Sequence, residues 1–102
     1  SLLEFEGKIL PNERKQWNWP NGWPPLQWLV TDGLMRYGYE DDARRIGEKY
    51  ARCIIGNFKE TGKVWEKYNV AEGTVNCSGR YDIASGFGWT NAIFMALRAQ
   101  AQ

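Results

Sequence analysis

Residues 24–58 read PPLQWLVTDGLMRYGYEDDARRIGEKYARCIIGNF, and the pattern of this stretch decides the fold. Either proline at its start can occupy a first helical turn, where the missing backbone N–H is not needed. The apolar side chains that follow have helical spacing, which predicts a helix as far as about Tyr37, and Gly38 is suited to end it. The buried stripe expected for this helix is Leu26, Leu29, Val30, Leu34 and Tyr37.

A second helix is expected from Asp41 or Asp42, because acidic side chains stabilise a helix N-terminus. Its apolar positions recur with helical spacing as far as Phe58. They are Ala43, Ile46, Tyr50, Cys53, Ile54 and Phe58. Because the link between the two helices is short, we expect them to form an antiparallel hairpin.

The segments that flank the hairpin are rich in aromatic residues, proline and glycine. Residues 16–25 read QWNWPNGWPP, and their three prolines exclude a continuous helix. Residues 59–88 read as a glycine-rich loop, in which 64–70 form a short extended piece. A last helix is expected from about Thr90, a good N-cap residue, to about Gln100. The predicted fold is therefore all-α: a helix hairpin plus a further helix, with long aromatic loops.

The hairpin brings these loops together. The first helix leaves the tryptophan-rich loop, the second returns the chain to the same end, and the third departs from there. We therefore expect the segments WNWPNGW (17–23), VWEKYN (64–69) and GFGWTN (86–91) to converge on one surface.

Composition narrows the possible functions. The chain has 102 residues, of which 43% are apolar and 25% charged, which suits one small globular domain. A net charge of +1 lacks the basic excess typical of nucleic-acid or anionic-membrane binding. No apolar run is long enough for a membrane span, and residues 1–20 show no signal-peptide pattern, so no targeting signal is predicted. Residues 1–15 form a polar lead-in.

The available side chains also limit the chemistry. The chain has no histidine and two cysteines, so a zinc site is not expected and catalysis by a Ser-His-Asp or Cys-His pair is excluded within it. Cys53 and Cys77 are expected to be free thiols. Acid–base chemistry must come from carboxylates, lysine or tyrosine. Asp32, four residues before Arg36, is expected to form a solvated helical ion pair.

Glu66 is the candidate catalytic residue, because a carboxylate among aromatic side chains suits proton transfer. The alternative is a surface loop charge paired with Lys67. The six tryptophans leave a similar choice. Those of the 16–25 loop can form a platform for a sugar ring or wedges between helices, and the same alternatives hold for Phe87 and Trp89.

Four segments, in order along the chain, carry a resemblance to a known family. They are QWNWPNGWPPLQ (16–27), the stretch from Gly33-Leu34 to Tyr37-Gly38, EKYNV (66–70) and GFGWTN (86–91). Over about residues 16–98 the chain resembles the α,α-trehalases, glycoside hydrolase family 37.

The resemblance implies that residues 16–102 form the C-terminal portion of a catalytic domain with an (α/α)6 barrel fold. It implies hydrolysis of the sugar trehalose to two glucose molecules with inversion, Glu66 acting as general base and no metal or cofactor taking part. The catalytic acid of the family, an aspartate, and its sugar-binding arginines lie upstream of the segments matched here. The partner implied beside the sugar is the N-terminal part of the barrel, or a second copy of the chain. The residues placed at the substrate by the resemblance are Trp17, Asn18, Arg80, Phe87 and Trp89.

Two positions depart from the family pattern. Asn18 stands where the family has aspartate, and Arg80 stands where the family has a glutamate that contacts substrate. These departures leave two further interpretations open. One is a trehalase-like domain that binds sugar without hydrolysing it, and the other is an inactive helical interaction domain.

Overall fold

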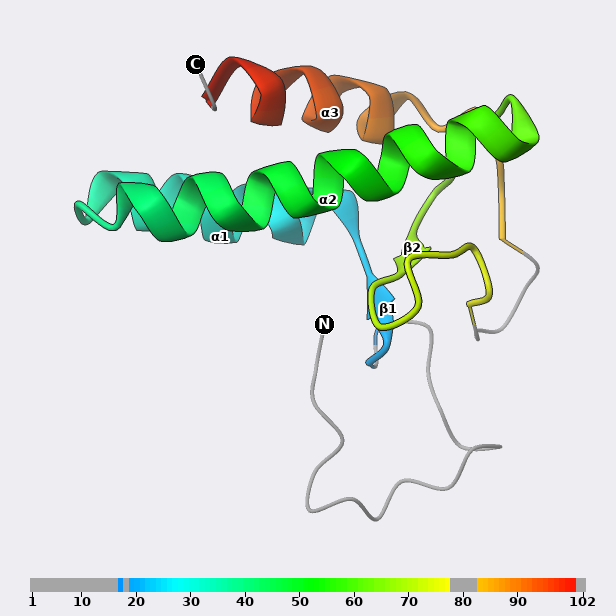
Figure 1. The fold of residues 1–102 in the computed structure, drawn as a ribbon, viewed down its shortest axis with the longest axis horizontal. Coiled ribbons are helices and arrows are strands. Elements are labelled where there is room, and N and C mark those ends of the chain that lie inside the picture. Colours follow the sequence, from blue (N-terminus) through cyan, green and yellow to red (C-terminus); the bar gives the residue numbers. More distant parts are fainter. Residues whose placement is uncertain (1–16, 18, 78–82, 101–102) are drawn as a thin grey trace, which may run out of the picture.

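The computed structural model describes residues 17, 19–77 and 83–100, and the predicted lead-in 1–15 lies outside them. The described chain is mostly helical, and each of its three helices packs against the other two (Figure 1). The elements, in chain order, are β1 Asn21–Gly22, α1 Pro24–Arg36, α2 Glu40–Thr61, β2 Tyr68–Asn69 and α3 Gly88–Gln100.

The predicted hairpin is confirmed. α1 and α2 are antiparallel, and α3 runs back along α2 in the same direction as α1 (Figure 1). The turn between α1 and α2 depends on Gly38, whose φ of +86° is favourable for glycine and strained for other residues. The backbone N–H of Tyr39 closes the turn by donating to the carbonyl of Leu34 at 2.8 Å.

The third helix begins at Gly88, two residues before the predicted start. Thr90 is therefore not an N-cap residue but lies inside the first turn of α3, fully buried. Its hydroxyl donates to the backbone carbonyl of Trp65, so it serves a contact between α3 and the loop after α2.

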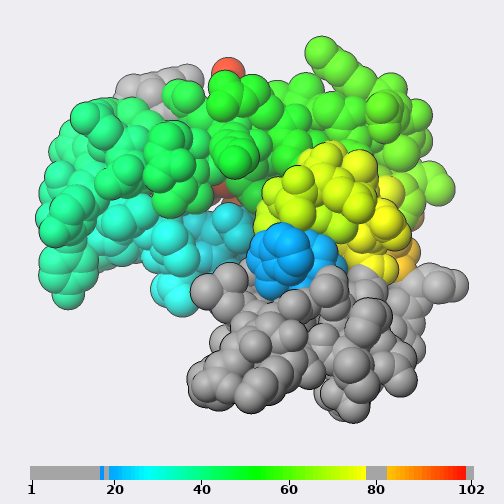
Figure 2. Space-filling model, turned by 60° about the horizontal axis from the view of Figure 1, so that its bottom comes forward, coloured from blue at the N-terminus to red at the C-terminus, as the bar shows by residue number. Residues whose placement is uncertain are grey.

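A two-stranded antiparallel sheet ties the loop before α1 to the loop after α2. Asn21 pairs with Asn69 and Gly22 with Tyr68. Glycine at position 22 permits this close pairing, because a Cβ there would lie 2.2 Å from a methyl carbon of Val70 and would force a shift. Figure 2 shows the surface over this junction, where the segment just before β1 and the segment around residues 70–77 lie side by side. The predicted extended piece 64–70 is thus confirmed in part, as β2.

The core lies between the helices and the loop that carries β2. Its buried members are Tyr50, Ile54, Tyr68 and Leu97, and Trp28 of α1 packs against them. Tyr50 also crosses to the small sheet, where its hydroxyl donates to the carbonyl of Gly22 at 2.8 Å. The same core therefore supports both the helices and the loops.

The buried stripe predicted for α1 is wrong in part. Leu29, Val30 and Tyr37 are 67%, 51% and 83% exposed, and the buried side chain of the helix interior is Thr31. α2 and α3 pack on only one face of α1, so apolar residues elsewhere on that helix remain exposed. Thr31 is accommodated because its hydroxyl donates to the carbonyl of Gln27 at 3.0 Å.

The stripe predicted for α2 holds except at its end, where Phe58 is 51% exposed. Among the residues that the structure describes, no helix is long and apolar enough to cross a membrane.

Candidate functional site

The segment that carries Glu66 leaves α2 at Gly62 and is fixed to the elements on either side of it. Gly62 ends the helix in the left-handed conformation, with φ of +69°. The backbone N–H of Glu66 donates to the carbonyl of Ala84 at 2.9 Å. Its own carbonyl accepts a hydrogen bond from the indole N–H of Trp89 at 3.1 Å. Glu66 is therefore held by its backbone between two later parts of the chain.

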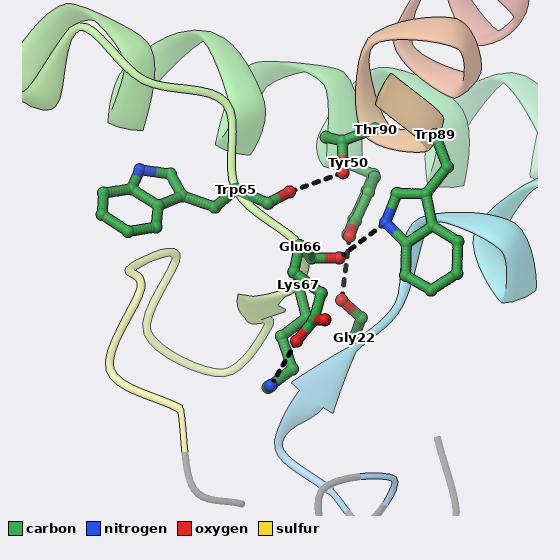
Figure 3. Close-up of polar contacts among 7 residues, drawn as sticks. All are labelled: Gly22, Tyr50, Trp65, Glu66, Lys67, Trp89 and Thr90. Atoms are coloured by element: carbon green, nitrogen blue, oxygen red, sulfur yellow. Dashed lines mark hydrogen bonds and ion pairs between the residues drawn. The ribbon is translucent and has the colours of Figure 1, made fainter. Parts of the chain in front are cut away.

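The neighbouring residue is fixed in the same way. The backbone N–H of Trp65 donates to the hydroxyl of Tyr68 at 3.2 Å, and its carbonyl accepts the hydroxyl of Thr90. Figure 3 shows that Trp89 and Thr90 reach this segment from α3, while Tyr50 reaches Gly22 from α2. Side chains of α2, β2 and α3 thus hold the backbone of residues 65 and 66 and of β1 in place.

The carboxylate of Glu66 is buried, with the residue only 4% exposed. Its Oε1 lies 2.8 Å from Nζ of Lys67, a residue that is 1% exposed. In Figure 3 both side chains point away from the helices, toward the side on which β1 lies. The pairing with Lys67 expected in the alternative interpretation is present, but the pair is buried and does not lie on the surface.

Tryptophan side chains form one wall of this site. Trp23 is 1% exposed, and its ring lies 4.7 Å from Nζ of Lys67. Trp17 stacks on it, with ring centroids 3.9 Å apart, and Trp89 meets it edge to face at 5.9 Å. Trp17 is 41% exposed, so the stack runs from the surface to the buried ion pair. Trp23 is a packing residue, whereas Trp17 is accessible.

The structure brings together most of the predicted site residues that it describes. Phe87 lies against Trp89 with ring centroids 5.1 Å apart, and Trp89 contacts both Trp23 and the backbone of Glu66. The predicted convergence of the three aromatic segments is therefore confirmed. Asn18 and Arg80, the other two predicted substrate contacts, lie outside the described residues.

Sequence reasoning missed three supports of this site. Lys67 was expected only as a surface charge, Tyr50 only as a core residue and Thr90 only as a helix cap. Tyr50 and Thr90 each use a hydroxyl to bridge elements far apart in sequence. No local pattern reveals such bridges, although the adjacency of Glu66 and Lys67 did indicate a pair.

Burial also raises the pKa of several side chains, and so determines which of them can lose a proton near neutral pH. Desolvation raises the pKa of Tyr50 far above its ordinary value, and it raises the pKa of Tyr68 as well. Both hydroxyls therefore stay protonated near neutral pH; that of Tyr50 donates to the Gly22 carbonyl, and that of Tyr68 accepts from the Trp65 N–H. Burial likewise raises the pKa of the Cys77 thiol from 9.0 to about 11. These two tyrosines and this cysteine are therefore not available as bases near neutral pH.

A groove with a volume of about 610 Å³ lies elsewhere, between α2 and the turn at residues 71–73. It is lined in part by Arg45, Lys49 and Arg52, and Glu66 does not border it. Within residues 17, 19–77 and 83–100, no three potential metal-ligating side chains of the His, Cys, Asp and Glu types are grouped.

Comparison with known proteins identifies the family. A sequence model of the family described as Trehalase matches residues 5–100. The periplasmic trehalase of Xanthomonas campestris pv. campestris (strain B100) is 43% identical over 84 residues, which cover 81% of this chain and 15% of that protein. The trehalase of Tenebrio molitor is 33% identical over 102 residues, which cover 93% of this chain and 18% of that protein.

The chain thus spans less than one fifth of the length of these relatives. Its packed helices and convergent aromatic loops agree with the fold expected from the resemblance. Since the family model matches nearly the whole length, the chain belongs to the trehalase family, whose fold is an (α/α)6 barrel.

Proposed function

We propose that this chain contributes the general base to a trehalase active site, which hydrolyses α,α-trehalose to two glucose molecules with inversion. Residues 16–102 form the C-terminal portion of the barrel domain in this proposal. The observation that supports it most directly is the buried carboxylate of Glu66, fixed by its backbone and surrounded by tryptophans.

Glu66 has the properties that a general base requires. An ionised carboxylate can accept a proton from water while that water attacks the anomeric carbon. The hydrogen bonds of its N–H and C=O fix its backbone, so little reorganisation is needed before reaction. The accessible ring of Trp17 and the half-buried rings of Phe87 and Trp89 offer aromatic surface to a sugar.

Inverting hydrolysis also needs a carboxylic acid about 6.5–9.5 Å from the base, to protonate the leaving oxygen. By resemblance that acid is an aspartate from an upstream part of the family, together with the arginines that hold the sugar hydroxyls. We therefore expect the 102-residue chain alone not to hydrolyse trehalose, and its exposed Leu29, Val30 and Met95 to contact the remainder of a barrel or a second copy.

A hybrid enzyme tests the proposal. In it, the segment of the Xanthomonas campestris periplasmic trehalase that aligns with this chain is replaced by the chain's own residues. We expect the hybrid to release glucose from trehalose, and Glu66→Gln to reduce kcat by about 10²–10⁴-fold. Because inversion converts only the attacked ring, proton NMR should show α- and β-glucose formed initially in equal amounts.

Glu60→Gln is the matched control, since Glu60 is an exposed carboxylate at the end of α2 and should leave turnover unchanged. Near-normal turnover of the Glu66→Gln hybrid would contradict the assignment of the base.

The sugar-binding alternative predicts a hybrid that folds and binds trehalose without turnover. It is favoured by Arg80, which can only donate hydrogen bonds where the family glutamate accepts them. Restoration of turnover by Arg80→Glu would support this alternative.

A further inference from the structure

Lys67 is buried to a degree that is unusual for a lysine, at 1% exposed. Removing an ammonium group from water is costly unless charges and dipoles of the protein replace the water. Two such partners are in place. Oε1 of Glu66 lies 2.8 Å from Nζ, and the face of the Trp23 ring lies 4.7 Å from it. The ammonium thus contacts a carboxylate and an aromatic ring.

The ring under the ammonium is itself immobilised. Trp23 is 1% exposed, is stacked on by Trp17 and is contacted at its edge by Trp89. It also directly precedes the prolines that begin α1. A ring held in this way provides a fixed negative face to which a cation is attracted, and the attraction is stronger where both groups are removed from water.

Trp89 connects this support to the backbone of Glu66, because its indole N–H donates to the Glu66 carbonyl at 3.1 Å. The same tryptophan therefore braces both Trp23 and the main chain of the base. Carboxylate, ammonium and the two indoles form one continuous assembly (the ion pair and Trp89 are drawn in Figure 3).

We propose that Lys67 is a positioning residue: supported by the face of Trp23, it fixes the orientation of the Glu66 carboxylate. This inference rests on the proposed function, in which Glu66 is the base. A purely structural role for Lys67 would require only that a cation neutralise the buried carboxylate. A positioning role requires in addition that Nζ of Lys67 keep its observed position, 2.8 Å from Oε1 of Glu66 and over the ring of Trp23.

The test uses the hybrid enzyme described above and separates kcat from KM. Lys67→Met removes the ammonium but keeps the side-chain length, and we expect kcat to fall about 10²-fold with KM changed less than about threefold. Lys67→Arg keeps the charge and moves the nitrogens, and we expect kcat to fall about tenfold with an unchanged melting temperature. A purely structural role would leave the arginine variant fully active.

Lys63→Met is the matched control. Nζ of Lys63 lies 5.6 Å from the ring of Trp65, but Lys63 is exposed and does not contact Glu66. Its replacement should leave kcat and KM unchanged.

A measurement on the 102-residue chain itself tests the geometry without activity. In the ¹⁵N-labelled chain we expect one lysine ammonium resonance that exchanges slowly with water and is shifted upfield by the ring of Trp23. The shift should disappear in Trp23→Leu and the resonance in Lys67→Met. Absence of such a resonance from the folded chain would overturn the proposal.

The kinetic outcomes are distinguishable. If Glu66→Gln abolishes turnover and Lys67→Arg retains normal kcat, the positioning role is refuted while the proposed function stands. If Lys67→Met does not fold, Lys67→Arg still decides between the two roles. Normal turnover of Glu66→Gln would refute both the proposed function and this inference.

Discussion

Two ion pairs of the same length lie in two different regions of this molecule. Lys67 and Glu66 are 2.8 Å apart at the loop end, and their side chains are 1% and 6% exposed. Arg36 and Asp32 are also 2.8 Å apart, near the end of α1 that faces the turn, and their side chains are 75% and 34% exposed. The distances are identical, but the exposure of the two pairs differs widely.

The difference in exposure shows which of the two ion pairs is held in a fixed geometry, namely the buried one. Water screens the Arg36–Asp32 pair and competes for both partners, so the pair adds little to stability. Around Lys67 and Glu66, tryptophan rings and backbone hydrogen bonds replace that water. Loss of one partner there leaves the other charge buried. The loop that we propose to carry the general base needs such rigidity, whereas the turn between two helices does not.

The largest expected effect is that of Lys67→Met on the stability of the chain. The variant leaves the Glu66 carboxylate buried without its ammonium, which should lower the free energy of unfolding by about 3–5 kcal/mol. Urea denaturation followed by circular dichroism measures it. The double variant Glu66→Gln/Lys67→Met, which leaves neither charge, should recover most of the loss. A loss below about 1 kcal/mol in the single variant would contradict the prediction, because the buried pair would then contribute no more to stability than an exposed pair does.

Cys77 extends the comparison from charge pairs to a single ionisable group. Burial raises its pKa from 9.0 to about 11, so at pH 8 the folded thiol should be alkylated about 100-fold more slowly than the urea-unfolded one. Because the folded pKa is the higher one, the thiol's contribution to stability is present below pH 9 and is lost as the pH rises through about 11. Iodoacetamide labelling in a Cys53→Ser background measures the rates, and equal rates in the two states would contradict the prediction.

Tyr50→Phe compares buried and exposed hydroxyls in the same way. It removes the hydrogen bond that joins α2 to the carbonyl of Gly22, which should cost about 1–2 kcal/mol of unfolding free energy. Tyr37→Phe is the matched control, because Tyr37 is 83% exposed at the opposite end of α1 and should change stability by less than about 0.5 kcal/mol. Equal losses of unfolding free energy for the two substitutions in urea denaturation would show that the hydrogen bond from Tyr50 to Gly22 does not stabilise the fold.

Much of the helical architecture could be predicted from sequence, because prolines, glycines and apolar spacing are local signals. The turn at Gly38 and the convergence of the aromatic segments both followed from them. The exposure of Leu29 and Val30 could not, since spacing identifies an apolar face without revealing which neighbour covers it.

The features of the candidate site likewise divide into those with a local sequence signal and those that depend on distant residues. Glu66 is proposed as the base from its motif, which is local in sequence. The burial of Lys67 depends on Trp23, 44 residues earlier in the chain, and on its fixed ring. A lysine beside a glutamate is normally a solvated pair, so the local pattern favoured the wrong environment. Thr90 was misinterpreted as a cap because its partner, the Trp65 carbonyl, lies 25 residues away.

The smallest expected effect belongs to the exposed pair with which the comparison began. Asp32→Asn removes the charge that Nε of Arg36 contacts, and we expect a loss of only about 0.3–0.5 kcal/mol at low salt. At 1 M salt the Debye length is about 3 Å, so this loss should nearly vanish, while the larger loss caused by Lys67→Met should persist because its pair is shielded from solvent ions. Urea denaturation of both variants at low and high salt measures the contrast. A salt-independent loss for Asp32→Asn would mean that Asp32 stabilises α1 by something other than its charge, and the contrast between a screened and a buried pair would then fail.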